Sequence, residues 1–266
     1  MNPLDWDLGN LPPGIPWGGV DEAGRGAWAG PVVAACAVLD PGSVSRWGHV
    51  LREAKDSKQV APEKRRAMAS ELKLVLAAWA VAEVDNVAID RENILEATLS
   101  AMRQAVRACA VRPRILLVDG NRAPRSGVPE RLVVDGDALS CAVACASILA
   151  KAHRDALMEG LEADHPGYGF QRHKGYGTPL HKDSLARLGP CAIHRLSYAP
   201  VAAQARPDPG LRAALGEGLE ACGSVEALQA WVEGRMRPGY GSLTLAWIEE
   251  LRTRYADRLA ALAGQA

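Results

Sequence analysis

Acidic residues follow several short apolar segments of this chain. Asp21 and Glu22 come directly after one such segment, Asp119 ends another, and Asp137 follows a third. Ligands bind outside the carboxyl ends of strands in open α/β sheets, so these carboxylates could converge if their strands are parallel neighbours. Grouped carboxylates repel one another unless a cation lies among them. Hard divalent cations take oxygen ligands, and a pair about 3.5–4 Å apart is the usual arrangement for cutting phosphodiesters.

Each acid also has a purely structural interpretation. Asp119-Gly120 and Asp135-Gly136 are turn dipeptides, in which Asp is common because it bonds its own backbone. Asp137 directly precedes a predicted helix and could be its N-cap. Asp21 and Glu22 are adjacent, so on a regular strand they would face opposite sides and could share a site only where strand geometry ends.

A glycine-flanked arginine follows the first acidic pair, in the sequence Gly24-Arg25-Gly26. A dinucleotide-binding fingerprint needs a helix after its glycines, whereas here Pro31 and a β-branched run follow. Glycines without side chains let the backbone approach a ligand closely, and arginine supplies a donor fork suited to phosphate. The alternative is a surface turn with an incidental arginine.

The elements that must position these residues can be predicted from hydrophobic patterning. Short apolar segments predict strands at 17–20, 31–39, 79–84, 115–118 and 132–134. Helical periodicity predicts helices over 62–78, 93–110 and about 138–163. This order predicts an α/β fold with a mixed sheet covered by helices.

The two ends of the chain differ from this central part. Residues 1–16 contain four prolines and two glycines and predict an irregular arm. Residues 164–204 are rich in Gly, His and Pro and predict an ordered cap of loops and short helices. After a linker at 207–210, three helical patterns occupy about 211–221, 225–235 and 242–263.

Composition narrows the protein class. Of 266 residues, 48% are hydrophobic and 23% charged, as in ordinary globular proteins. Lys+Arg and Asp+Glu both number 31, which excludes a generally basic surface but leaves room for a local basic groove. The six cysteines form no C-x-x-C pair, and no signal peptide or 18-residue apolar run is present. We therefore expect a soluble, cytoplasmic protein with cysteines as buried apolar residues.

Six motifs occur in an order typical of one family. The sequence resembles bacterial type 2 ribonuclease H, the ribonuclease HII family, over about residues 17–204. The matching motifs are Val20–Gly26, Asp56-Ser57-Lys58, Val118–Asn121, Gly136-Asp137, Ala146–Lys151 with Arg154-Asp155, and His173–Thr178.

The resemblance implies a ribonuclease H-like fold, with a mixed five-stranded sheet flanked by helices and a helical C-terminal extension. It covers a catalytic domain with its cap (17–204), which leaves an N-terminal arm (1–16) and a helical extension of unknown role (205–266) outside it. The implied activity is endonucleolytic cleavage of RNA in RNA–DNA hybrids, with incision on the 5′ side of single ribonucleotides in duplex DNA, by two metal ions, Mg²⁺ or Mn²⁺.

The resemblance also implies residue roles. The metal-binding, catalytic acids would be Asp21, Glu22, Asp119 and Asp137. Residues implied to contact the substrate are Gly24, Arg25 and Gly26 at the nucleotide bearing the 2′-OH, Tyr176 at the junction sugar, and Lys58 at the nucleic-acid backbone.

Several basic residues could supply a local phosphate-binding face, with a solvated surface as the alternative for at least half of them. They are Lys151, Arg154, Arg172, Lys174 and Lys182. His173 and His181 are expected at the surface or in contact with phosphate. Asp135 occupies a position that is often Lys in the family, so it could add negative charge near the metals or point away.

Two other functions remain open at this point. One is a nucleic-acid-binding module that has lost catalysis, against which the four matching acids argue. The other is a metal-dependent phosphoesterase acting on a small substrate, which would need neither the Gly-Arg-Gly turn nor Tyr176.

Overall fold

The computed structural model describes residues 1–54 and 61–264. It forms two compact units. The first comprises Met1–Gly26 and Pro31–Gly160, and the second comprises Ala27–Gly30 and Leu161–Ala266. The boundary between the catalytic domain and the C-terminal extension at 204/205 stays a prediction.

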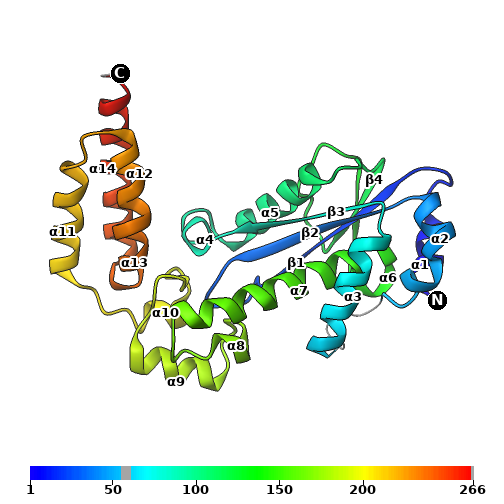
Figure 1. Ribbon diagram of the computed structural model, residues 1–266, viewed down its shortest axis with the longest axis horizontal. Helices are drawn as coiled ribbons and strands as arrows, with labels where there is room; N and C mark the ends of the chain where they lie inside the picture. Colours follow the sequence, from blue (N-terminus) through cyan, green and yellow to red (C-terminus); the bar gives the residue numbers. More distant parts are fainter. Residues whose placement is uncertain (55–60, 265–266) are drawn as a thin grey trace. The chain divides into compact units, whose positions relative to one another are not determined.

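A mixed five-stranded sheet forms the centre of the first unit (Figure 1). Its strands are β1 (Trp17–Ala23), β2 (Val32–Leu39), β3 (Ala78–Val84), β4 (Ile115–Asp119) and β5 (Glu130–Val133). The order across the sheet is β3-β2-β1-β4-β5. The β1–β2 and β2–β3 pairs are antiparallel, whereas β1–β4 and β4–β5 are parallel. The predicted mixed α/β sheet is therefore confirmed.

Seven helices accompany this sheet in the described part of the first unit. They are α1 (Pro3–Asn10), α2 (Pro41–Leu51), α3 (Pro62–Val75), α4 (Asn86–Glu92), α5 (Ile94–Ala108), α6 (Gly136–Leu139) and α7 (Cys141–Asp164), the last of which runs past Gly160. Helix α5 packs against β1, β2 and β3, and α7 lies on the opposite face (Figure 1). Alanines 97, 101 and 105 of α5 are fully buried, so small side chains allow close packing of this helix on the sheet.

The N-terminal segment differs from its prediction, because α1 is a regular helix rather than an irregular arm. Asn2 caps it through its side chain, and Pro3 occupies its first turn, where a missing N–H costs nothing. The prediction counted the prolines as helix breakers and was wrong at this position. Asp7 of α1 is fully buried and accepts hydrogen bonds from Trp17 Nε1 at 3.2 Å and Ala142 N at 3.0 Å.

In the second unit, the segment Ala27–Gly30 is hydrogen-bonded to loops between short helices. The helices are α8 (Phe170–His173), α9 (Pro179–Leu188) and α10 (Ala199–Ala202). The Trp28 N–H donates to the Gly175 carbonyl, and the Trp28 carbonyl accepts from Arg195 N, both at 2.8 Å. Backbone hydrogen bonds thus hold this four-residue segment within the cap predicted for residues 164–204.

The C-terminal residues are helical, as predicted. Their elements are α11 (Pro209–Glu220), α12 (Val225–Trp231), a π-helical turn η1 (Val232–Met236), α13 (Arg237–Gly239), a 3-10 turn η2 (Tyr240–Ser242) and α14 (Leu245–Ala263). Helices α11 and α12 pack on α14. The second predicted helix continues further than expected, through turns that end at Ser242. In the described residues, no helix is both long and apolar enough to cross a membrane.

Candidate functional site

Asp21 and Asp119 lie side by side at the carboxyl ends of two parallel strands. The register of β1 and β4 pairs Val20 with Val118, so the next residues on each strand are these two acids. Neighbouring strands are about 4.8 Å apart. Asp21 is 5% exposed, and its pKa is raised well above the usual value, first by burial and then by the charges of Glu22 and Asp119. The two strands are parallel neighbours, as predicted, and the charge of Asp119 helps to raise the pKa of Asp21.

Backbone contacts connect Asp119 to the segment that carries Asp137. Asp119 Oδ1 accepts a hydrogen bond from Gly136 N at 2.7 Å. Gly136 begins α6, and Asp137, its neighbour in the chain, is 7% exposed. Asp135 is exposed and has a left-handed backbone with φ of 53°. The two acids of this segment thus lie in different environments, one buried and one in solvent.

Glu22 remains within regular strand geometry, because β1 continues to Ala23. Successive side chains on a regular strand leave opposite faces, yet the charge of Glu22 acts on Asp21 more strongly than that of Asp119. Glu22 forms an ion pair with Arg25 at 3.8 Å. Its negative charge still contributes to the raised pKa of Asp21.

The Gly24-Arg25-Gly26 turn lies on a buried arginine. Gly24 has φ of 91°, and a Cβ added to it would lie 1.9 Å from Arg154 Nε. Only glycine therefore fits at this position, for both conformation and space. Arg154 is fully buried and donates through Nε to the Pro31 carbonyl at 2.9 Å. The prediction that Arg154 belongs to a basic surface is wrong, because the guanidinium lies beneath the turn.

A polar stripe on α7 contains Lys151 and Arg154, which the sequence assigned to a possible basic face, and Ser147, to which it assigned no role. Ser147, Lys151 and Arg154 are spaced i, i+4, i+7, so they share one face of the helix. The Ser147 side chain is hydrogen-bonded to Asp21, which lowers the pKa of that carboxyl and partly offsets its burial. The same helix face thus contacts both the carboxylate of β1 and the glycine turn. The signal was present as polar residues at helical spacing in an otherwise apolar segment.

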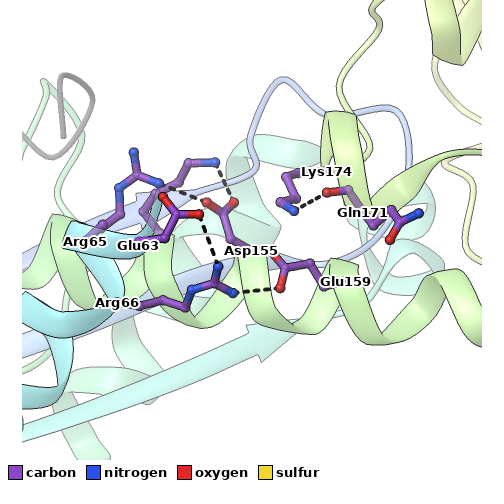
Figure 2. Close-up of polar contacts among 8 residues, drawn as sticks. Glu63, Arg65, Arg66, Asp155, Glu159, Gln171 and Lys174 are labelled. Carbon is purple, nitrogen blue, oxygen red and sulfur yellow. Dashed lines mark hydrogen bonds and ion pairs between the residues drawn. The ribbon is translucent and has the colours of Figure 1, made fainter. Parts of the chain in front are cut away.

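Ion pairs attach α3 to α7 next to this stripe (Figure 2). Arg65 Nη1 lies 3.0 Å from Asp155 Oδ2, and Lys151 Nζ lies 2.6 Å from the other oxygen. Arg66 pairs with Glu159 at 2.8 Å. Asp155 is thus shared by Arg65 and Lys151, which ties the lysine to the contact between the two helices.

Lys58 lies outside the described residues, so its predicted contact with the nucleic-acid backbone stays a prediction. The described chain resumes at residue 61, just before α3.

Tyr176 belongs to the second unit and is half-buried. Its carbonyl lies 3.0 Å from His181 Nδ1, and His181 Nε2 lies 3.1 Å from His194 Nε2. His173 stacks on His181 with ring centroids 4.3 Å apart. His173 is 7% exposed and His181 is fully buried, so their predicted surface positions are wrong. Burial lowers the pKa of His181 to about 4 and that of His194 to about 3.

Hydrogen-bond chemistry assigns one tautomer to each histidine. A carbonyl only accepts, so His181 Nδ1 must carry a proton and its Nε2 must accept. His194 Nε2 therefore donates to His181, and His194 Nδ1 accepts from the Cys191 N–H at 2.9 Å. The Tyr176 carbonyl and the Cys191 N–H, at the two ends of this hydrogen-bond series, require the same pair of tautomers. The pair is thus neutral and holds the backbone at Tyr176.

The acids fit a cation by chemistry and placement, although they are not arranged as a finished metal site. No group of three or more His, Cys, Asp or Glu side chains in residues 1–54 and 61–264 has the arrangement of a metal centre. Asp21 is nevertheless buried beside two like charges, which is unfavourable for a carboxylate without a cation. Oxygen ligands of this kind suit hard divalent ions.

Comparison with known proteins decides the family. The sequence pattern described as "Ribonuclease HII" matches residues 18–201. The chain belongs to the ribonuclease HII family. The ribonuclease HII of Rhizorhabdus wittichii is 48% identical over 189 residues, which cover 71% of this chain and 90% of that protein. The ribonuclease HII of Caulobacter vibrioides is 47% identical over 185 residues, which cover 70% of this chain and 85% of that protein.

Solved structures agree with this assignment. The crystal structure of the ribonuclease H2 from Pyrococcus horikoshii OT3 has a TM-score of 0.63 at 27% identity, covering 71% of this chain and 97% of that one. The structure of Bst-RNase HIII in complex with Mn²⁺ has a TM-score of 0.55 at 19% identity, covering 72% of this chain and 70% of that one. This similarity supports the fold only.

Membership of the ribonuclease HII family confirms the ribonuclease H-like fold and establishes the enzyme class. The chain is a metal-dependent endoribonuclease that acts on RNA–DNA hybrids. The match ends at residue 201, so it does not extend into α11–α14.

Proposed function

We propose that this ribonuclease HII also incises duplex DNA on the 5′ side of a single embedded ribonucleotide, leaving a 5′-phosphate. The catalytic, metal-binding residues would be Asp21, Glu22, Asp119 and Asp137. The observation that carries the proposal is the placement of buried Asp21 beside Asp119 at adjacent strand ends, with a raised pKa.

The proposed cofactor is Mg²⁺ or Mn²⁺, bound as a pair. When bound, such ions activate a water and stabilise the leaving oxygen. Asp21 and Asp119 would both contribute to holding such an ion, because they follow paired positions on adjacent strands. Asp137 would contribute from the start of α6, and Glu22 from the end of β1, next to Asp21 in the chain. The Mn²⁺ complex of Bst-RNase HIII, a protein of the same fold, supports this choice of cofactor.

Recognition of the ribonucleotide is assigned to the Gly24-Arg25-Gly26 turn. The 2′-OH is both donor and acceptor, and it distinguishes RNA from DNA. Backbone groups of a glycine turn reach such a hydroxyl without obstruction, and Arg154 beneath Gly24 fixes the conformation of the turn. The Arg25 side chain is 52% exposed and available to phosphate. Tyr176 would pack on the junction sugar, and Lys58 would contact the backbone.

The remaining assignments are the domain boundary and the cellular location. We propose that residues 205–266 form an appended module, because every candidate acid precedes residue 140. A cytoplasmic location suits the proposed nucleic-acid substrate, and all six cysteines are free thiols, as in reducing compartments.

A substrate panel tests the proposed function. An RNA–DNA hybrid, a DNA duplex with one ribonucleotide, duplex RNA and a free nucleotide would each be incubated with Mg²⁺, with Mn²⁺ and with a chelator. We expect metal-dependent cleavage of the first two substrates only. Release of phosphate from the free nucleotide, or cleavage in the presence of chelator, would contradict the proposal.

A further inference from the structure

A cavity in the first unit has three arginines and one glutamate among its lining residues. Its volume is about 350 Å³, and it is lined by residues from α5 and from the loop that follows β4. Arg103 comes from the helix, whereas Asn121, Arg122 and Arg125 come from the loop. The one acid in its lining is Glu96, in the first turn of α5.

The loop that carries these arginines is held in place from two sides. Arg103 Nη1 donates to the Pro124 carbonyl at 3.1 Å. The Glu130 carboxylate accepts from Ser126 N at 2.6 Å and from Arg125 N at 3.2 Å. Arg125 has a left-handed backbone with φ of 59°, which an arginine adopts only when its surroundings fix it. The loop therefore presents its side chains from a defined backbone.

The charges in the cavity favour an anion. Arg122 and Arg125 are exposed, and no ion pair joins their guanidinium groups to any residue in the described part of the chain. Three arginines and one glutamate line the cavity, and Glu130 bonds the backbone of the loop, so an excess of positive charge remains. Guanidinium groups bind phosphate through paired N–H donors, so a phosphate is the anion that this lining suits best.

The position of the cavity connects it with the acids. Arg122 is three residues after Asp119, so their Cα atoms are within about 11 Å of each other. Helix α5 leads directly into parallel strand β4, so its first turn lies at the carboxyl end of the sheet and its last turn at the other end. Duplex phosphates on one strand recur every 3.4 Å of helix rise. A phosphate in this cavity would thus lie only a few nucleotides from a bond held at the acids.

We propose that this arginine-lined cavity binds a backbone phosphodiester of the substrate duplex, a few nucleotides from the cleaved bond. The inference rests on the proposed function, since it concerns the same substrate. Arg122 and Arg125 supply charge and donors, Arg103 fixes the loop, and Glu96 weakens the site by repulsion.

Three variants test the proposal by salt dependence of binding. Arg122→Gln with Arg125→Gln removes two charges from the cavity. Arg107→Gln is the matched control, because Arg107 is an exposed arginine of the same helix at its opposite end. Glu96→Gln should act in the opposite direction. The dissociation constant of a labelled RNA–DNA hybrid would be measured by anisotropy in chelator across a range of KCl concentrations.

We expect the double variant to bind several-fold more weakly, with a slope of log K against log[salt] reduced in magnitude by about 0.9, the value for one lost phosphate contact. Its kcat at saturating substrate should be that of the wild type. Arg107→Gln should match the wild type, and Glu96→Gln should bind more tightly. An unchanged slope in the double variant, or the same loss in Arg107→Gln, would overturn the inference. Failure of the wild type to incise a DNA duplex with one ribonucleotide would overturn the proposed function instead.

Discussion

Gly136 N donates a hydrogen bond to Asp119 Oδ1 at 2.7 Å, and this contact fixes the candidate site across two chain segments. It attaches the end of β4 to the start of α6, so Asp137 is held next to an acid that precedes it by 18 positions. The parallel register of β1 and β4 places Asp119 beside Asp21, because Val118 pairs with Val20. The site is therefore positioned by backbone interactions at the ends of two neighbouring strands.

Replacing Asp119 by Asn should abolish cleavage and preserve the fold. The amide oxygen of Asn can still accept from Gly136 N, but the charge that would hold a metal is lost. Melting temperature should be unchanged or higher, because repulsion with Asp21 is relieved. Cleavage of a labelled hybrid and a thermal melt measure both effects. Asp135→Asn is the control, since Asp135 is exposed and should tolerate the change. Near-normal turnover of Asp119→Asn at saturating Mg²⁺ would refute the role of Asp119.

Arg25→Ala should impair cleavage at a single ribonucleotide more than it impairs metal binding. The ion pair of Arg25 with Glu22 is partly exposed, so its loss should cost the fold little. Arg25→Lys keeps the charge but loses the planar donor fork, and should be intermediate. Cleavage rates and Mg²⁺ titration midpoints distinguish the two effects. A shifted midpoint with unchanged preference for ribonucleotide-containing duplex would count against the assignment.

The histidine pair makes a prediction about protonation. Nitrogen-15 spectra should show His181 protonated at Nδ1 and His194 at Nε2 at neutral pH. The pKa of His181 is lowered to about 4 in the folded protein from an ordinary 6.5, so the folded state disfavours the proton. Its stabilising contribution is therefore complete above pH 6.5 and is lost as pH falls toward 4, by about 3 kcal/mol at most.

A matched variant isolates this histidine effect. His181→Asn keeps a donor near the Tyr176 carbonyl but does not titrate. Its difference in unfolding free energy from the wild type should change between pH 7 and pH 5, and its KM for a duplex with one ribonucleotide should rise more than its kcat falls. The opposite tautomers, or a stability difference that is constant with pH, would show that the pair does not hold Tyr176 as described.

The C-terminal helices should stabilise the second unit without supplying catalytic groups. A chain truncated after Gln204 should still cleave a ribonucleotide-containing duplex, with at most a moderate loss of affinity or stability. Some loss is expected because Arg206 donates to the Ala186 carbonyl at 2.7 Å. A Cβ on Gly241 would lie 2.4 Å from the Pro190 carbonyl oxygen, so Gly241→Val should give a similar loss in the full chain. A truncated chain that melts cooperatively yet is inactive would contradict the proposed boundary.

The strands and their acids were predictable because their signals are local. An apolar run such as Ile115–Val118 predicts a buried strand, and the acid at its end predicts a ligand at the sheet edge. Helix α1 was missed because proline acts in opposite ways at a helix start and in a helix interior.

Other features depend on contacts that sequence patterning does not encode. Arg154 reads as a surface charge until the fold places Gly24 against it. Similarly, His181 and His194 form a neutral buried pair only because they meet across 13 positions. In both cases a polar residue is buried because a distant partner satisfies it, which local periodicity cannot reveal.

The position of incision tests the central claim most directly. A DNA duplex with one embedded ribonucleotide, labelled on the strand that contains it, would be digested with Mg²⁺ and the products sized beside chemical markers. The account predicts a single cut on the 5′ side of the ribonucleotide, with a 3′-hydroxyl and a 5′-phosphate, that disappears in Asp119→Asn. A cut on the 3′ side, a cyclic phosphate product, or equal cutting of an all-DNA duplex would contradict it.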